Sequence, residues 1–158
     1  MGIVVTGMHR SGTSTVARVV KALGFESGGE LMEAAPDNPR GFFERRDVMN
    51  INDRWLSSLG GSWCAPPQTT PATWRHLDNV TLDRDRKALG LFDPSGPAWF
   101  IKDPRISLLL PLWDRLAYVQ IPSVIVVRDP REVAASLQLR NGMTSHRSLA
   151  LWFAYVQA

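Results

Sequence analysis

The stretch that decides the fold is "GIVVTGMHRSGTSTVARVVKALGF", residues 2–25. Its short apolar, β-branched run at residues 2–6 is typical of a strand that is buried on both faces of a sheet. Beyond a glycine-bounded loop, the apolar spacing predicts a helix over residues 13–23, which Gly24 is suited to end. The apolar face of this helix is expected to consist of Val16, Val19, Val20 and Leu23.

The loop between the two elements reads "GMHRSGTS", residues 7–14. Successive backbone N–H groups in a glycine-rich turn, followed by a helix N-terminus, form a site for an anion. The spacing has the length of a Walker A loop but lacks its lysine, since Thr13 follows Gly12 and the cation of the loop is Arg10. The alternative is a tight strand–helix turn that binds no ligand.

The rest of the chain alternates between strand-like and helix-like segments. Strands are expected over residues 97–103 and 122–129, and helices over residues 44–61, 78–91, 107–116, 130–140 and 145–158. Loops are expected over residues 26–40 and 62–73. This order predicts an α/β fold, namely a three-layer α/β/α domain with a central parallel sheet, over residues 1–158. The layout of the loop, which is that of a phosphate-binding P-loop, makes the P-loop NTPase type the expected form of this fold. Ligands of such sheets bind at the carboxyl ends of the strands, where Thr6, Asp103 and Arg128 stand.

Composition excludes several classes of protein. The 158 residues are 44% hydrophobic and 21% charged, which suits one globular domain with a core. The sequence holds no uninterrupted apolar run of the length that a membrane span needs. Cys64 is the single cysteine, so disulfides and a cysteine-based metal site are not expected, and a reducing cytoplasm fits. The formal charge is +3 without a block of like charges, so no nucleic-acid partner is expected.

The loop resembles the 5′-phosphosulfate loop of sulfotransferases that use 3′-phosphoadenosine 5′-phosphosulfate (PAPS). The usual form in that family is Lys or Arg followed by Ser-Gly-Thr-Ser/Thr. The resemblance implies that Arg10 contacts the sulfate and the bridging oxygen. His9, beside Arg10 in the loop, is expected either to orient Arg10 or the phosphate or to act as a base. The resemblance places the following residues around the 5′-phosphate: Ser11, Gly12, Thr13 and Ser14.

A second, distant segment matches the same family. "VIVVRDPREVAASL" resembles the 3′-phosphate motif, a strand that ends in Arg followed by a Ser eight residues later in the next helix; Arg128 and Ser136 meet that spacing. Taken alone, the segment is equally well explained as a helix cap, with Asp129 as N-cap and Pro130 at the first helical position.

The resemblance extends from Gly2 to about Phe153 and includes "NPRGFFERRDVMNINDRWLSSLGGSW" and "FIKDPRISLLLPLW". It implies in-line transfer of a sulfuryl group from PAPS to an acceptor hydroxyl of a carbohydrate, a lipid or a small molecule. The product would be adenosine 3′,5′-bisphosphate (PAP), and no metal would be required. Family members continue past "LALWFAYV", so the resemblance also implies that residues 1–158 lack the C-terminal portion. It leaves the oligomeric state open.

The sequence offers three candidates for the residue that accepts the proton of the acceptor hydroxyl. Lys102 in "KDPRISLLLP" matches the family lysine, and either Lys102 or Arg10 is expected to assist the departure of the bridging oxygen. Pro104 stands where cytosolic relatives have their histidine base. Glu44 is the preferred candidate, because the neighbouring Phe42 and Phe43 would raise its pKa. The alternative is that Glu44 only balances a helix dipole.

Two further candidates for the base are Asp103 and His9. A Lys–Asp pair at Lys102 would keep Asp103 charged and weakly basic. Arg45 and Arg105 are expected either to bind an anionic acceptor or to pair with nearby acids. Most of the six tryptophans are expected in the core, although any of them is able to stack on a sugar.

Two rival functions remain open from the sequence. A P-loop nucleotide kinase or NTPase would need a Walker B acid at a strand end, and either Asp103 or Asp129 stands at such a place. The missing loop lysine weighs against this class. A non-catalytic nucleotide-binding module is the second rival.

Overall fold

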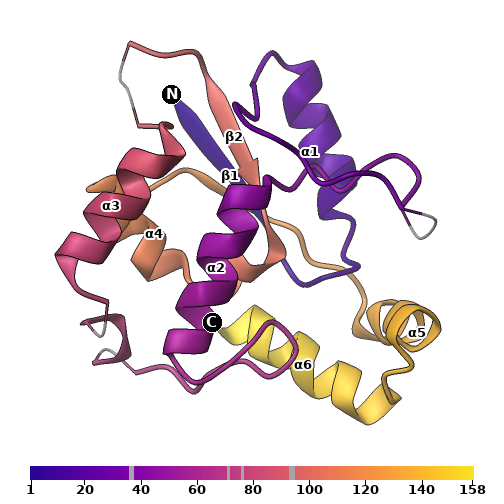
Figure 1. The fold of residues 1–158 in the computed structure, drawn as a ribbon. Helices are drawn as coiled ribbons and strands as arrows, with labels where there is room; N and C mark the ends of the chain where they lie inside the picture. Colours follow the sequence, from indigo (N-terminus) through magenta and orange to yellow (C-terminus); the bar gives the residue numbers. More distant parts are fainter. Residues whose placement is uncertain (36–37, 71, 76, 93–94) are drawn as a thin grey trace.

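The computed structural model describes residues 1–35, 38–70, 72–75, 77–92 and 95–158. The described residues form six α-helices around a three-stranded parallel sheet (Figure 1). The α/β class and the parallel sheet that the sequence predicts are therefore confirmed. In the described part of the chain, no helix is long and apolar enough to cross a membrane.

The sheet has the strand order β2-β1-β3, with β1 (Gly2–Thr6) in the middle. Its neighbours are β2 (Trp99–Lys102) and β3 (Ser123–Ile125). Val4 pairs with Ile101 of β2 and with Ser123 of β3. The third strand is shorter than the predicted residues 122–129. Its ladder ends after Val126 donates to the Thr6 carbonyl at 2.8 Å, because the chain then turns toward the cap of the next helix.

Alternation along the strands gives the sheet two apolar faces. Val5 and Phe100 lie in a small core with Ala17 and Val20 of α1 (Thr13–Ala22). Val4 lies in the larger core on the other face. That core also contains residues of α2 (Arg46–Ser58), α3 (Asn79–Leu89) and α4 (Leu110–Ala117). Helices thus pack on both faces of the sheet, which is compatible with a three-layer arrangement (Figure 1).

The predicted apolar face of α1 is only partly correct. The buried residues of this helix are Thr13, Ala17 and Val20, whereas Val19 is 57% exposed and Leu23 is 73% exposed. The helix begins at Thr13, whose side chain is itself on the buried face. Residues four and seven positions later then face the sheet.

The chain from β2 onward builds the end of the sheet at which the strands finish. A 3₁₀ helix, η2 (Pro104–Leu108), follows β2 directly, and α5 (Pro130–Asn141) and α6 (Ser145–Gln157) follow β3. The last two helices pack side by side (Figure 1). Asp129 caps α5 as predicted, since its Oδ1 accepts from the Arg131 amide at 2.8 Å.

The remaining predictions concern the connections. Residues 26–40 and 62–73 hold no α-helix or strand in their described parts, as predicted, except that a 3₁₀ helix, η1 (Thr73–Arg75), begins at the end of the second segment. Residues 36–37 and 71 of these two predicted loops lie outside the described residues. Trp55 and Trp113 are fully buried in the core, as expected of most tryptophans.

Candidate functional site

The carboxyl ends of β1 and β2 are held together by the Thr6 side chain. Its hydroxyl donates to the carbonyl of Asp103 at 2.9 Å and shares a hydrogen bond of 2.9 Å with the Ser107 hydroxyl. These contacts join the start of the glycine-rich loop to η2. The polar residues that follow the two strands are thereby brought to one edge of the sheet.

The loop of residues 7–12 depends on its glycines. Gly7 has a φ of 138°, and a Cβ atom there would lie 2.2 Å from the Val126 carbonyl oxygen. Gly12, with a φ of 93°, precedes the first helical residue of α1. In the described structure α1 has no side-chain cap and no acid in its first turn. Its N-terminal N–H groups and positive dipole end therefore suit an anion.

A cavity of about 200 Å³, here called the loop cavity, opens at this N-terminus. It brings together residues of the loop, the segment before α2, the end of β2 and helix α5. Its lining residues are His9, Arg10, Gly12, Thr13, Ser14, Thr15, Asn38, Phe42, Glu44, Lys102, Pro104, Arg128 and Arg140. Seven of the predicted site residues thus line the same cavity as Glu44, the preferred candidate for the base.

The loop residue Arg10 meets two predicted site residues from a distant part of the chain, Arg128 and Ser136, beside the loop cavity. The Arg10 Nε atom donates to the Ser136 hydroxyl at 2.8 Å, and the Arg128 guanidinium donates to the Arg10 carbonyl at 3.2 Å. Arg128 is also paired with Glu132 at 2.6 Å in an exposed contact. Arg10 has a φ of 70°, in the left-handed region that costs a residue with a Cβ atom some strain. Because it donates to Ser136, the Arg10 side chain is oriented toward α5.

Glu44 and Lys102 form a buried ion pair on the cavity wall. The Lys102 ammonium donates to Glu44 Oε1 at 2.5 Å, and both side chains are almost inaccessible to solvent. Burial raises the pKa of the Glu44 carboxyl, and Asp103 adds to the increase, whereas Lys102 and Arg105 lower it; the net direction is upward. A raised pKa was the property expected of Glu44 from its apolar neighbours.

Asp103 does not have the surroundings expected of a base. It is fully buried, its Oδ1 accepts from the Arg105 amide at 2.8 Å, and both carboxylate oxygens accept from the Arg105 guanidinium. The Lys–Asp pair that the sequence suggests at residues 102 and 103 is not formed, because successive strand side chains point to opposite faces. Lys102 pairs with Glu44, and Asp103 caps η2.

His9 lies where several cations converge. Its Nε2 atom is buried and has no hydrogen-bond partner among the described residues. Burial lowers the pKa of His9 well below its ordinary value, and the following cations lower it further: Arg105, Lys102, Arg140 and Arg10. The ring is therefore neutral near neutral pH. It packs against Trp63, with ring centroids 4.7 Å apart.

Two serines that the sequence predicts around the 5′-phosphate, Ser11 and Ser14, lie in different surroundings. The Ser14 hydroxyl donates to the Phe42 carbonyl at 3.2 Å, which ties the start of α1 to the segment before α2. Ser11 is buried and does not line the loop cavity; its hydroxyl has no partner within the described residues. Ser11 thus does not share the surroundings of Thr13 and Ser14.

A second, smaller cavity of about 120 Å³ adjoins the first. We call it the side cavity; its lining residues are His9, Met32, Phe42, Glu44, Trp63, Arg105, Arg140 and Asn141.

Arg105 pairs with Asp103 at 3.0 Å, with Asp53 at 2.6 Å and with Glu44 at 3.6 Å. Arg45 is held away from both cavities by Asp47 and by backbone carbonyls. Both arginines therefore pair with acids, one of the two outcomes that the sequence left open.

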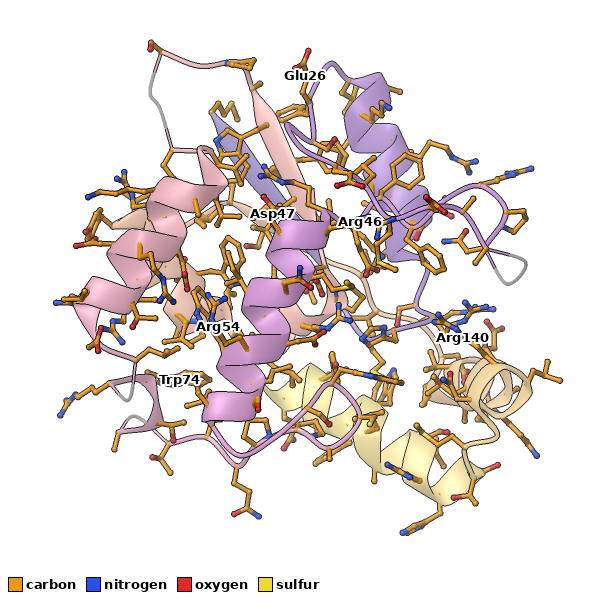
Figure 2. The ribbon with its side chains drawn as sticks, viewed as in Figure 1. Glu26, Arg46, Asp47, Arg54, Trp74 and Arg140 are labelled. Carbon is orange, nitrogen blue, oxygen red and sulfur yellow. The ribbon has the colours of Figure 1, made fainter. Side chains whose placement is uncertain are left out.

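Sequence reasoning missed Asn38 and Arg140. Asn38 donates to the Gly41 carbonyl at 2.7 Å and lies in a loop whose course the sequence does not reveal. Arg140 had a usable signal, because it stands four residues after Ser136 on α5 and such residues share a helix face. Figure 2 shows Arg140 at the side of α5 that faces the loop preceding α1.

Within the described residues, no group of three or more His, Cys, Asp or Glu side chains is arranged to hold a metal ion. The groups that face the loop cavity are instead backbone N–H groups, hydroxyls, arginines and a lysine–glutamate pair. The chain matches no protein-family profile, no curated protein and no solved structure.

Proposed function

We propose that this chain has a P-loop NTPase-like fold and is a PAPS-dependent sulfotransferase that transfers a sulfuryl group to an acceptor hydroxyl. The observation that carries the proposal is the meeting of Arg10, Arg128 and Ser136 beside the loop cavity. A donor with a 5′-phosphosulfate and a 3′-phosphate needs two separate anion sites. In the proposal the loop supplies one of them, and Arg128, before α5, with Ser136, in the middle of α5, supplies the other.

In this proposal each part of the loop cavity has a defined task. The N-terminal N–H groups of α1 and the hydroxyls of Thr13 and Ser14 bind the 5′-phosphate. Arg128 and Ser136 bind the 3′-phosphate, for which the planar guanidinium is well suited. The exposed ion pair of Arg128 with Glu132 contributes little and is readily exchanged for a phosphate.

The chemistry is an in-line displacement at sulfur. The Glu44 carboxylate accepts the proton of the acceptor hydroxyl, and the acceptor oxygen forms a bond to sulfur. The bond between sulfur and the bridging oxygen breaks, and its electron pair stays on the 5′-phosphate of the product PAP. Lys102 and Arg10 stabilise the negative charge that develops on the transferring group and on the leaving oxygen.

The kinase alternative has less support. The acid that such an enzyme places at a strand end for Mg²⁺ would be Asp103, whose carboxylate oxygens are both engaged by Arg105 in the protein interior. Asp129, the other candidate, caps α5 and pairs with Arg131. A non-catalytic nucleotide-binding module would use the same loop cavity without needing Glu44 as a base.

The experiment that tests the proposal is titration calorimetry with PAP, ATP and ADP, each with and without Mg²⁺. We expect metal-independent binding of PAP that is at least about tenfold tighter than that of ADP, because one phosphate–arginine contact is worth 1.4 kcal/mol or more. Binding of ATP that requires Mg²⁺ and exceeds that of PAP would instead establish the kinase class. Transfer of sulfate from PAPS to a panel of hydroxyl compounds separates the enzyme from the binding module.

A further inference from the structure

We propose that the side cavity is the acceptor subsite and that it takes an uncharged, hydroxyl-bearing six-membered ring, the chemistry shared by phenols and monosaccharides. This inference rests on the proposed function. It adds the location of the acceptor, and it narrows the carbohydrate, lipid or small-molecule hydroxyl that the resemblance implies to a single ring without net charge.

The side cavity lies in the correct place for an acceptor. It shares His9, Phe42, Glu44 and Arg140 with the loop cavity, so the two cavities meet at these residues. A ring in the side cavity with a hydroxyl directed toward the loop cavity would present that hydroxyl to Glu44. Its oxygen would then bond to the sulfur as the sulfur–bridging-oxygen bond breaks and Glu44 takes the proton. The leaving electron pair remains on PAP.

The size and the apolar half of the cavity favour a single ring. A volume of about 120 Å³ is below the range of pockets that hold drug-sized ligands. Met32, Phe42 and Trp63 supply apolar and aromatic surface on which a flat ring or the C–H face of a sugar packs. Trp63 is held in place, because its carbonyl accepts from the Tyr155 hydroxyl at 2.9 Å and its ring packs on His9.

The charges around the side cavity favour a neutral ligand. Arg105 is already paired with Asp103, Asp53 and Glu44, so an acidic acceptor would compete with three carboxylates for it. An acidic acceptor would also be repelled by the phosphates of the donor in the adjoining cavity. A basic acceptor would meet the guanidinium groups of Arg105 and Arg140, both of which line the cavity. A hydroxylated ring without net charge avoids all three costs.

The test measures ring binding to the protein–PAP complex, a dead-end complex in which no transfer takes place. The probes are phenol, methyl glucopyranoside, 4-hydroxybenzoate and tyramine, compared by saturation-transfer NMR and calorimetry. We expect at least one neutral ring to bind about tenfold or more tightly than either charged ring, because a charged ring meets the unfavourable interactions described above. A tenfold difference in affinity corresponds to about 1.4 kcal/mol. Tightest binding of 4-hydroxybenzoate or tyramine would overturn the inference. Phenol binding without glucoside binding, or the reverse, supports it and identifies the source of the ring.

A matched pair of variants locates the bound ring. Trp63→Phe should weaken binding of the neutral ring about threefold or more, since a smaller ring loses stacking area. Trp74→Phe is the control and should leave ring binding unchanged. Trp74 lines neither cavity, and Figure 2 shows it on the other side of α2 from Arg140. Equal affinities in the two variants would place the ring elsewhere and contradict the inference.

The failure of this inference is distinguishable from failure of the proposed function. PAP affinity is measured first on each protein, and its absence from the unmodified chain would contradict the proposed function itself. If PAP binds and no neutral ring does, the proposed function stands and the acceptor inference fails. If Trp63→Phe does not fold, intermolecular NOEs between the bound ring and the aromatic protons of Phe42 and Trp63 in the unmodified protein decide the matter. NOEs to both residues support the side cavity, and none to either contradicts it.

Discussion

Arg10 and Ser136 are 126 residues apart in the chain, and the Arg10 Nε atom donates a hydrogen bond of 2.8 Å to the Ser136 hydroxyl. The contact joins the loop after β1, the central strand, to the helix after β3, an edge strand. Arg128 strengthens the junction by donating to the Arg10 carbonyl at 3.2 Å. In the proposed complex this junction lies between the 5′ and the 3′ anions, so it sets the distance between the two anion sites.

The first prediction concerns the 3′-phosphate. Arg128→Ala and Ser136→Ala should each weaken PAP binding about tenfold or more, because each removes a donor to the phosphate. Binding of adenosine 5′-phosphosulfate, which has no 3′-phosphate, should change less than threefold. Calorimetry with both ligands measures the difference. Arg131→Ala is the matched control, since Arg131 lies on the first turn of α5 but pairs with Asp129 at the surface. Equal losses for both ligands would contradict the assignment.

The second prediction concerns the buried pair of Glu44 and Lys102. Glu44→Gln should lower the free energy of unfolding by about 3 kcal/mol, because it leaves a buried ammonium without its counter-charge. PAP affinity should be retained or increased, since Lys102 then becomes available to the ligand. Turnover with PAPS should fall at least about a hundredfold if Glu44 is the base. Urea unfolding, calorimetry and a sulfate-transfer assay measure the three quantities.

Asp53→Asn is the control for that variant. Asp53 also pairs with Arg105, but it is half exposed and lines neither cavity. The change should cost less than about 1 kcal/mol of stability and leave turnover unaltered. Full activity in Glu44→Gln would remove Glu44 from the role of base and leave His9 as the remaining candidate on the cavity wall.

The sequence was sufficient to predict that the loop after β1 and the segment around Arg128 lie at one edge of the sheet, for a physical reason. The strand before the loop and the strand before Arg128 are short apolar runs whose carboxyl ends must meet at one edge of a parallel sheet. Glycines at positions 7 and 12 mark a backbone that side chains with a Cβ atom would not tolerate or would strain. Apolar runs and glycines of this kind are local signals, and they indicate where in the fold the loop and Arg128 lie as well as which groups they present.

What could not be predicted depends on side-chain direction and on long-range packing. Lys102 and Asp103 are neighbours in sequence, yet they point to different faces and find different partners, Glu44 and Arg105. The buried face of α1 includes Thr13, which no apolar pattern marks. The side cavity is lined by residues from six stretches of the chain, and no local spacing encodes such a meeting.

The third prediction uses the lowered pKa of His9. The unfolded chain takes up a proton on His9 near its ordinary pKa, whereas the folded protein resists this proton to lower pH. The unfolded state therefore binds more protons in this window, so the free energy of unfolding should rise as pH increases from about 5 to 7. His9→Gln should flatten this rise, and His146→Gln, a change at an exposed residue of α6, should not. Urea unfolding at several pH values measures the slopes. Parallel slopes for the unmodified protein and His9→Gln would contradict the assignment.

The last prediction concerns the glycine that starts the loop. Gly7→Ala should lower the free energy of unfolding by about 3 kcal/mol or more, because it combines an unfavourable φ with a Cβ atom 2.2 Å from the Val126 carbonyl oxygen. Gly60→Ala provides the comparison. Gly60 also has a positive φ of 76°, but a Cβ atom there would meet no other atom within 4 Å, so the cost should be only about 1 kcal/mol. The Val126 amide is hydrogen-bonded to Thr6, so any movement that relieves the clash shifts the β1–β3 junction and the loop together. PAP affinity should therefore fall in Gly7→Ala even under conditions in which the variant is fully folded, while Gly60→Ala should bind PAP normally. Equal stability losses in the two variants would show that the close approach of Gly7 to Val126 is not required.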